Sequence, residues 1–317
     1  MNRRELLQRS AALSVAAAVP FAAAATPASA SAAGTPAAAG NTASDSGREA
    51  AQLRAPDHGS IPVAFVISEG AVVIDFCGPW EVFSNVNVPG RDETPFQLYT
   101  VAEAARPVTA SGGLTIVPNF TFATAPAPKV IVIPAQHEAS EAALGWIRRA
   151  SERTDVTMSV CTGAFVLAKT GLLSGKPATT HHNAYAELAM QFPDVQVKRG
   201  ARFVEAGNLA TSGGLSSGID LSLRVVERYF GRDVATQTAY YMEYQGKGWT
   251  DPAANEVYRT RRVSTPEHPL CPVCEMDVDS TRAPKSVYRG RTYYFCMPDH
   301  KAAFDAAPDK FVEATPT

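Results

Sequence analysis

Three short runs of uncharged, mostly β-branched residues recur along this chain, at residues 62–67, 130–134 and 156–160. Apolar runs without alternation are typical of strands buried on both faces of a parallel sheet. Helical patterns lie between or after them, at residues 138–152, 219–230 and 234–245. Strands alternating with helices predict an α/β fold, a flavodoxin-like, doubly wound parallel sheet over residues 59–248.

The first 30 residues have the composition of an export signal. Arg3 and Arg4 precede an uncharged stretch at 11–25, which the small residues Ala28-Ser29-Ala30 follow. This order predicts a removable signal peptide at 1–30. The paired arginines indicate the twin-arginine type, and an ordinary secretory signal is the alternative. We therefore expect export to a periplasm or to the outside of the cell, with the Ala-, Ser- and Gly-rich residues 31–58 as a flexible linker.

The charge balance and the cysteines narrow the choice of partners. The chain has 29 basic and 31 acidic residues and no basic block, which argues against a nucleic acid partner. No apolar run in the predicted mature chain is long enough for an integral membrane segment. Three of the five cysteines lie within the last 47 residues, so a disulfide framework is not indicated. Cys77 is interpreted as an ordinary core thiol.

The segment around Cys161 has the layout of a nucleophile elbow. Cys161 ends an apolar run, and Thr162 and Gly163 lead directly into a helical pattern. A tight strand-to-helix turn exposes its side chain at the carboxyl edge of the sheet, where sites lie in this fold. The N–H groups at the start of the helix favour a thiolate. The alternative is a buried structural cysteine.

Three further segments carry polar residues of the kinds found in sites. Asp75 follows the first predicted strand, His181 follows a Gly-Pro turn, and residues 211–220 form a Gly-rich loop before a helix. Each also has a structural explanation. Ser217 and Asp220 have the spacing of a capping box, Asp75 could cap a helix, and a lone histidine is more often structural than catalytic.

The end of the chain contains a separate cluster of metal-ligating residues. Cys271, Cys274, Cys296 and His300 follow the pattern C-x2-C, then 21 residues, then C-x3-H. Three thiolates and one imidazole complete a tetrahedral shell for one Zn²⁺ ion, and soft sulfur ligands also suit Cu(I). We predict a linker at 249–268 and a metal-stabilised module at 269–315; the alternative is a disulfide between Cys271 and Cys274.

Together, the segments within 59–248 resemble the PfpI/ThiJ superfamily, which has the class I glutamine-amidotransferase-like fold. Cys161-Thr162-Gly163, with Asp-x-x-Gly-Pro at 75–79 and Gly-Ile-Asp at 218–220, is similar to isonitrile hydratase and to the sensor half of AraC-type regulators. The resemblance implies that Cys161 is the nucleophile, Thr162 its assistant and Asp75 the acid/base. It also implies a small-molecule substrate or ligand, no cofactor in the α/β domain, and a homodimer.

One position departs from the superfamily pattern. Many members have Gly-Gly after the strand equivalent to 130–134, where this chain has Ala135-Gln136-His137. We expect Gln136 and His137 to line the site beside His181 and Gly163, and the substrate to differ as a result.

The last segment resembles the YHS domain. Pro-Val-Cys-x-Met at 272–276 and Tyr-x-Gly-x-x-Tyr-Tyr-Phe-Cys at 288–296 carry the resemblance. Cys271 stands where aspartate is common, and His300 where a second cysteine is usual. YHS domains are associated with heavy-metal handling. The sequence thus predicts an exported cysteine-dependent hydratase or hydrolase with a metal module. The alternatives are a non-catalytic metal-handling or thiol-sensing protein and a binding domain without turnover.

Overall fold

The computed structural model describes residues 51–137, 139–260 and 262–312. The predicted signal peptide at 1–30 and most of the predicted linker at 31–58 lie outside these residues. The limits predicted for the two folded domains stay predictions, although Trp249 and Asn255, beyond the predicted end of the α/β domain, are buried.

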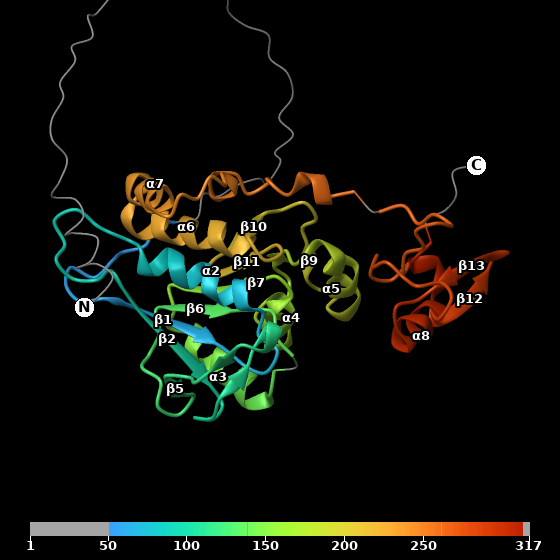
Figure 1. The fold of residues 1–317 in the computed structure, drawn as a ribbon, viewed down its shortest axis with the longest axis horizontal. Coiled ribbons are helices and arrows are strands. Elements are labelled where there is room, and N and C mark those ends of the chain that lie inside the picture. The colour runs from blue at the N-terminus through green and yellow to red at the C-terminus, as the bar shows by residue number, and fades with distance from the viewer. Residues whose placement is uncertain (1–50, 138, 261, 313–317) are drawn as a thin grey trace, which may run out of the picture. The chain divides into compact units, whose positions relative to one another are not determined.

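A seven-stranded sheet forms the centre of the α/β domain among the described residues (Figure 1). Its order is β10-β11-β7-β6-β1-β2-β5. The strands are β1 (Ile61–Val66), β2 (Phe96–Ala102), β5 (Phe120–Thr121), β6 (Val130–Ile133), β7 (Val156–Val160), β10 (Phe203–Ala206) and β11 (Leu209–Ser212). All neighbours run parallel except β10, which pairs antiparallel with β11 at the edge. The α/β fold is therefore confirmed, with a sheet that is mostly rather than wholly parallel.

Helices cover both faces of this sheet, which explains its uncharged strands. On one face α2 (Val73–Ser84), α6 (Ser217–Phe230) and α7 (Arg232–Tyr241) enclose a core that includes Phe65, Met158 and Leu221. On the other, α3 (Glu141–Ser151) and α4 (Gly163–Lys169) bury residues such as Ile131. Figure 1 shows the two layers. The remaining elements of this domain are α5 (Tyr185–Gln191) and the short strands β3 (Val108–Thr109), β4 (Thr115–Ile116), β8 (Pro177–Ala178) and β9 (Gln196–Val197).

The helix predicted at 138–152 begins three residues later than expected, at Glu141. The hydroxyl of Ser140 accepts a hydrogen bond from the Ala143 N–H at 3.2 Å, which caps the helix. The buried face contains Leu144, Trp146 and Ile147.

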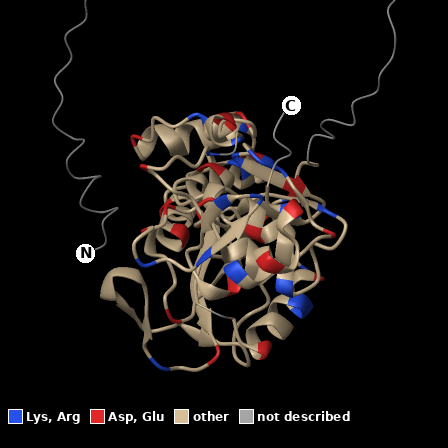
Figure 2. Cartoon of the chain, turned by 90° about the vertical axis from the view of Figure 1, so that its right-hand side faces the viewer, with Lys and Arg blue, Asp and Glu red and all other residues tan. Residues whose placement is uncertain are grey.

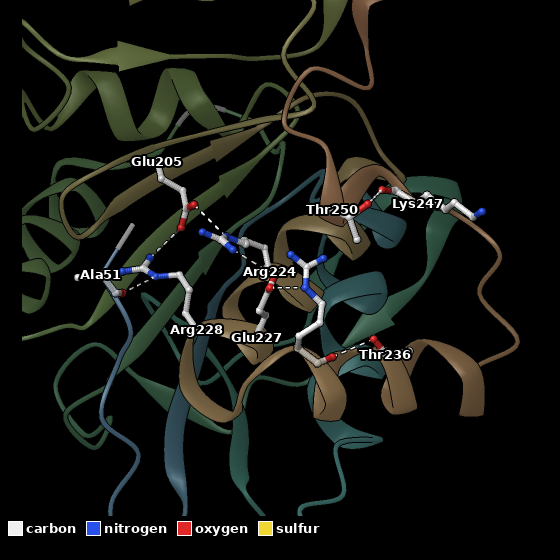
Figure 3. A network of polar contacts seen from close by, with 9 residues as sticks. Ala51, Glu205, Arg224, Glu227, Arg228, Thr236, Lys247 and Thr250 are labelled. Atoms are coloured by element: carbon white, nitrogen blue, oxygen red, sulfur yellow. Dashed lines mark hydrogen bonds and ion pairs between the residues drawn. The ribbon is translucent and has the colours of Figure 1, made fainter. Parts of the chain in front are cut away.

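A partly buried charge network ties the antiparallel edge strand to α6 (Figure 3). Glu205 of β10 accepts hydrogen bonds from Arg224 at 3.1 Å and from Arg228 at 3.0 Å. Arg228 also donates to the carbonyl oxygen of Ala51 at 3.2 Å. The start of the described chain is thereby held against the α/β domain.

The C-terminal module has a hairpin and one helix. Strands β12 (Lys285–Tyr288) and β13 (Arg291–Tyr294) pair antiparallel and are followed by α8 (Pro298–Ala306). Both turn residues, Arg289 and Gly290, have positive φ, as tight hairpin turns require. A small core contains Phe295 and Phe304, with Cys271 and Cys274 buried in it.

None of the helices in the part of the chain described here is long and apolar enough to cross a membrane. On the face drawn in Figure 2, basic and acidic residues are interspersed rather than gathered by sign. Whether a nucleic acid partner is absent stays a prediction.

Candidate active site

The nucleophile elbow is built at the end of β7. Cys161 follows the last residue of this strand and has φ of 58°, the left-handed region that non-glycine residues seldom occupy. Its N–H donates to the Gly213 carbonyl oxygen at 2.9 Å, and its own carbonyl oxygen accepts from the Thr180 hydroxyl at 2.9 Å. Backbone strain of this kind persists where surrounding bonds hold it, and it concentrates at functional sites.

Gly163 allows this elbow to lie close to the neighbouring strand. A Cβ on residue 163 would collide with the Ile133 carbonyl oxygen and with the backbone of Pro134. The glycine therefore permits α4 to begin directly against the end of β6, which sets the position of Cys161 relative to that edge.

Asp75 reaches the site from the first turn of α2 and is fully buried. Its Oδ2 accepts a hydrogen bond from the Ala135 N–H at 3.0 Å. It does not cap its own helix, because Val72 occupies the cap position and makes no side-chain cap. Among the described residues, Asp75 Oδ1 has no hydrogen-bond partner within reach. One oxygen of the carboxyl group is thus left to take up or release a proton.

The pKa values of Asp75 and Cys161 are both raised. Burial raises the pKa of Asp75 to about 7, while the Ala135 N–H and the nearby Cys161 thiol act in the opposite direction. Burial, followed by the charge of Asp75, raises the pKa of Cys161 to about 11. The expectation of a low-pKa thiolate is therefore wrong: loss of water outweighs the donors around the sulfur. Near neutral pH the pair is a thiol beside a carboxyl group close to half protonation.

Three donors still converge on the Cys161 sulfur. The backbone N–H groups of Leu215 and Thr162 and the Thr162 hydroxyl all act to lower its pKa. Thr162 precedes α4 without capping it, so its hydroxyl is left for the sulfur. The Leu215 N–H comes from the turn before α6, where Leu215 has a positive φ of 41°. These donors stabilise negative charge that develops at the sulfur.

His181 lies at the rim of this arrangement. Its ring packs against Gly214, where a Cβ would collide with it. Its Nδ1 accepts the Asn183 N–H at 3.3 Å, which leaves the proton of the neutral ring on Nε2. Burial, followed by His182, lowers the pKa of His181, so the ring is neutral at physiological pH.

Gln136 and His137 line a separate cavity of about 330 Å³ at the ends of β1, β2 and β6. Gln136 accepts a hydrogen bond from the Ser68 hydroxyl at 2.9 Å, and the ring of His137 lies against Gly70. Cys161 and Asp75 are not among the residues that line this cavity. At the departure from Gly-Gly, the Ala135 N–H binds Asp75 rather than facing a substrate.

The capping box expected from Ser217 and Asp220 does not form. Ser216 occupies the cap position of α6, and the Ser217 hydroxyl has no hydrogen-bond partner among the described residues. Asp220 instead accepts from Arg202 at 2.6 Å and from the Tyr244 hydroxyl at 3.0 Å. Residue spacing within α6 could not reveal this partner, because Arg202 lies outside the helix, directly before β10.

Cys271, Cys274, Cys296 and His300 come together in the C-terminal module, with all ligand atoms within 4.8 Å of one another. The His300 Nδ1 lies 3.6 Å from the Cys271 sulfur and 3.1 Å from that of Cys296, and the Cys274 and Cys296 sulfurs are 3.4 Å apart. Tetrahedral Zn²⁺ with bonds of about 2.0–2.3 Å places its ligands about 3.5–3.8 Å apart, so the donor set fits one ion. All four cysteine and histidine positions were predicted from their spacing.

Two donors to the site were missed from the sequence. The N–H groups of Ala135 and Leu215 belong to the backbone, which carries no residue identity. The Gly-rich turn before α6 was the available signal for Leu215. The contact of Ala135 with Asp75 joins positions 60 residues apart, and no sequence signal pointed to it.

Comparison with known proteins agrees with this geometry. Residues 62–228 match the model of the DJ-1/PfpI family, and residues 271–315 match that of the YHS domain. Isonitrile hydratase from Pseudomonas putida is 33% identical over 190 residues, which are 58% of this chain and 79% of that protein. The HTH-type transcriptional regulator GbdR from Pseudomonas aeruginosa is 23% identical over 188 residues, which are 58% of this chain and 50% of the regulator. A crystal structure of a ThiJ/PfpI family protein from Pseudomonas syringae superposes with a TM-score of 0.53 at 27% identity, covering 60% of this chain and 77% of that one.

Proposed function

The chain belongs to the DJ-1/PfpI family, with a YHS domain after the family domain, and from this premise we propose that it is a cysteine-dependent hydratase of isonitriles or related small electrophiles. The observation that carries the proposal is the buried pairing of Cys161 with Asp75, whose Oδ1 is left without a partner. The similarity to isonitrile hydratase supports the choice of substrate class.

The two side chains suffice for a balanced hydration. Asp75 takes the thiol proton while the Cys161 sulfur bonds to the terminal carbon of R–N≡C, and the same proton passes to that carbon, giving the thioimidate R–N=CH–S–Cys. Water then adds to this carbon, and one of its protons goes to the nitrogen. Cleavage of the C–S bond returns the proton to the thiol and releases the formamide R–NH–CHO. The N–H groups of Thr162 and Leu215 stabilise the charge that develops near the sulfur.

The narrow access to Cys161 favours a slender electrophile. The residue is 7% exposed, so a bulky reacting centre such as a branched carbonyl carbon would need the site to open. The terminal carbon of an isonitrile carries no substituent beyond its nitrogen and can approach through a narrow opening. The raised pKa of the Cys161 thiol favours an enzyme over a thiol sensor, because a sensor that works without a proton acceptor depends on a ready supply of thiolate.

Replacing the nucleophile is expected to abolish turnover. With cyclohexyl isonitrile as the probe, Cys161→Ala should lower kcat/KM for formamide formation by at least about 10³-fold, because no other thiol is paired with a buried carboxyl among the described residues. Product formation is followed by chromatography. Cys77→Ala is the matched control and should retain activity, since Cys77 is a half-buried thiol on the same helix as Asp75. Equal activity in Cys161→Ala and the unmodified chain would contradict the proposal.

The rate should depend on pH in the manner of a coupled pair. The active form has lost one of the two protons shared by Asp75 and Cys161, so kcat/KM rises as the pH passes through about 7. It falls again toward pH 11, where the second proton leaves. Initial rates between pH 5 and pH 10 test the rising limb. A profile that is flat across pH 6–8 would argue against Asp75 as the proton carrier.

We also propose that the chain is exported and that its YHS module holds one metal ion. The composition of residues 1–30 supports export, and the four-residue cluster of the module supports the metal. Cys271, Cys274, Cys296 and His300 would hold the ion, which would join the loop before the hairpin to the start of α8. Zn²⁺ would act there as a structural cross-link, and Cu(I) is the alternative occupant.

A further inference from the structure

We propose that Arg202 is a positioning residue for Cys161, acting through the turn at residues 213–216. This inference rests on the proposed role of Cys161 as nucleophile. Gly213 of the turn accepts the Cys161 N–H at 2.9 Å, and the Leu215 N–H of the turn acts to lower the pKa of the Cys161 thiol. Arg202 bonds to both ends of the turn.

The turn is a conformation that needs external support. Leu215 has a φ of 41°, which is unfavourable for a residue with a branched side chain and persists only where neighbouring contacts fix it. The two preceding glycines are packed tightly: a Cβ on Gly213 would lie 2.6 Å from the Asn255 side chain, and one on Gly214 would collide with His181. This packing leaves the turn little room to adopt another backbone conformation.

Arg202 is the residue that anchors it. Its carbonyl oxygen accepts the Gly213 N–H at 2.9 Å, and Gly213 in turn accepts the Cys161 N–H at 2.9 Å. Its Nη2 donates to the Ser216 hydroxyl at 3.1 Å, and its Nη1 donates to Asn255 at 3.2 Å. A guanidinium group can make these bonds at once because its donors lie in a rigid fork, which a lysine ammonium does not offer.

Asp220 fixes the guanidinium itself. The carboxylate accepts from Arg202 Nε at 2.6 Å and is 1% exposed, against 15% for the arginine side chain. Gly248 covers the pair, since a Cβ there would lie 2.8 Å from Asp220 and 2.9 Å from Arg202. The buried carboxylate therefore holds Arg202 in one orientation at the edge of an open pocket that both residues line. Asp75 is the charged side chain that acts on Cys161 directly among the described residues, so the ion pair influences the sulfur only through the turn.

The test measures the reactivity of Cys161 rather than turnover. Iodoacetamide alkylation of the full chain is followed at pH 7–10 by mass spectrometry of the peptide that contains Cys161. The double variant R202M/D220N removes the pair without leaving a buried charge unpaired. Alkylation should slow by about fivefold or more at each pH, because loss of an N–H donor to the sulfur raises its pKa. Ser216→Ala, at an exposed position, should slow alkylation in the same direction by a smaller factor.

Arg224→Met is the matched control. Arg224 is 13% exposed and pairs with Glu205 one helical turn further along α6 than Asp220, so its loss disturbs a similar ion pair that makes no bond to the turn. Its alkylation profile should match that of the unmodified chain. Unchanged or faster alkylation in R202M/D220N, or equal slowing in R224M, would overturn the inference. If R202M/D220N is alkylated more slowly than the unmodified chain, but the unmodified chain does not hydrate isonitriles, the role of Arg202 is upheld and the proposed reaction is rejected.

Discussion

Asp75→Asn is expected to make the protein more stable at pH 8 while removing its activity. The carboxyl group is fully buried, and its pKa in the folded chain is about 7 instead of 3.8. Between these two values the unfolded chain is ionised at this residue whereas the folded chain keeps its proton. Stability therefore falls as the pH rises from about 4 to about 7 and stays low above it.

Asparagine removes this dependence. A difference of about three pKa units corresponds to a ceiling of about 4 kcal/mol. Urea unfolding should show Asp75→Asn to be more stable by a few kcal/mol at pH 8 and by little at pH 4. The asparagine oxygen can still accept the Ala135 N–H, so the gain is not cancelled by a lost bond. Asp92→Asn, at an exposed position, is the control and should leave the pH profile of stability unchanged.

The same variant separates the catalytic from the structural role of Asp75. Without a proton carrier, kcat/KM for isonitrile hydration should fall by about 10²–10⁴-fold, and the rise through pH 7 should disappear. A variant that is both less stable and less active would mean that Asp75 is ionised and paired in the folded chain. That outcome would contradict the raised pKa of Asp75 and, with it, the expected rise of kcat/KM through pH 7.

Removal of the metal is expected to unfold the C-terminal module and leave the α/β domain intact. The module's core contains few large side chains, and two of its buried residues, Cys271 and Cys274, belong to the four-residue cluster that could hold the metal. Binding of structural Zn²⁺ contributes about 10–16 kcal/mol in small domains of this kind, far more than such a core supplies. Cys274→Ser should therefore lose one equivalent of metal and the protection of residues 271–312 from hydrogen exchange.

Elemental analysis and intact mass of the purified chain provide the measurement. Cys77→Ser, outside the cluster, should keep the full metal content, and isonitrile hydration should be unchanged in both variants. Cys274 found in a disulfide with Cys271 or Cys296, with no metal bound, would reject the metal site. The 3.4 Å between the Cys274 and Cys296 sulfurs makes this outcome a direct competitor of metal binding.

The metal cluster could be predicted from the sequence because its chemistry is largely local. Cys271 and Cys274 are three residues apart and Cys296 and His300 are four, so each pair is close in space whatever the rest of the chain does. Only the meeting of the two pairs needed the fold. The elbow at Cys161 is local in the same way: an apolar run, a cysteine and a small residue before a helix place the thiol at the edge of the sheet.

An α/β protein with Cys161 at a strand end can be predicted from the residue pattern alone, because burial patterns and turn residues act over a few positions. The chemistry of that thiol depends on contacts made in the folded chain. Burial and Asp75 set its pKa, the turn at 213–216 supplies Leu215, and Ala135 holds the carboxyl group. These contacts join segments more than 50 residues apart with no repeating pattern, and a pKa depends on the sum of all groups around an atom. That sum exists only once the chain has folded.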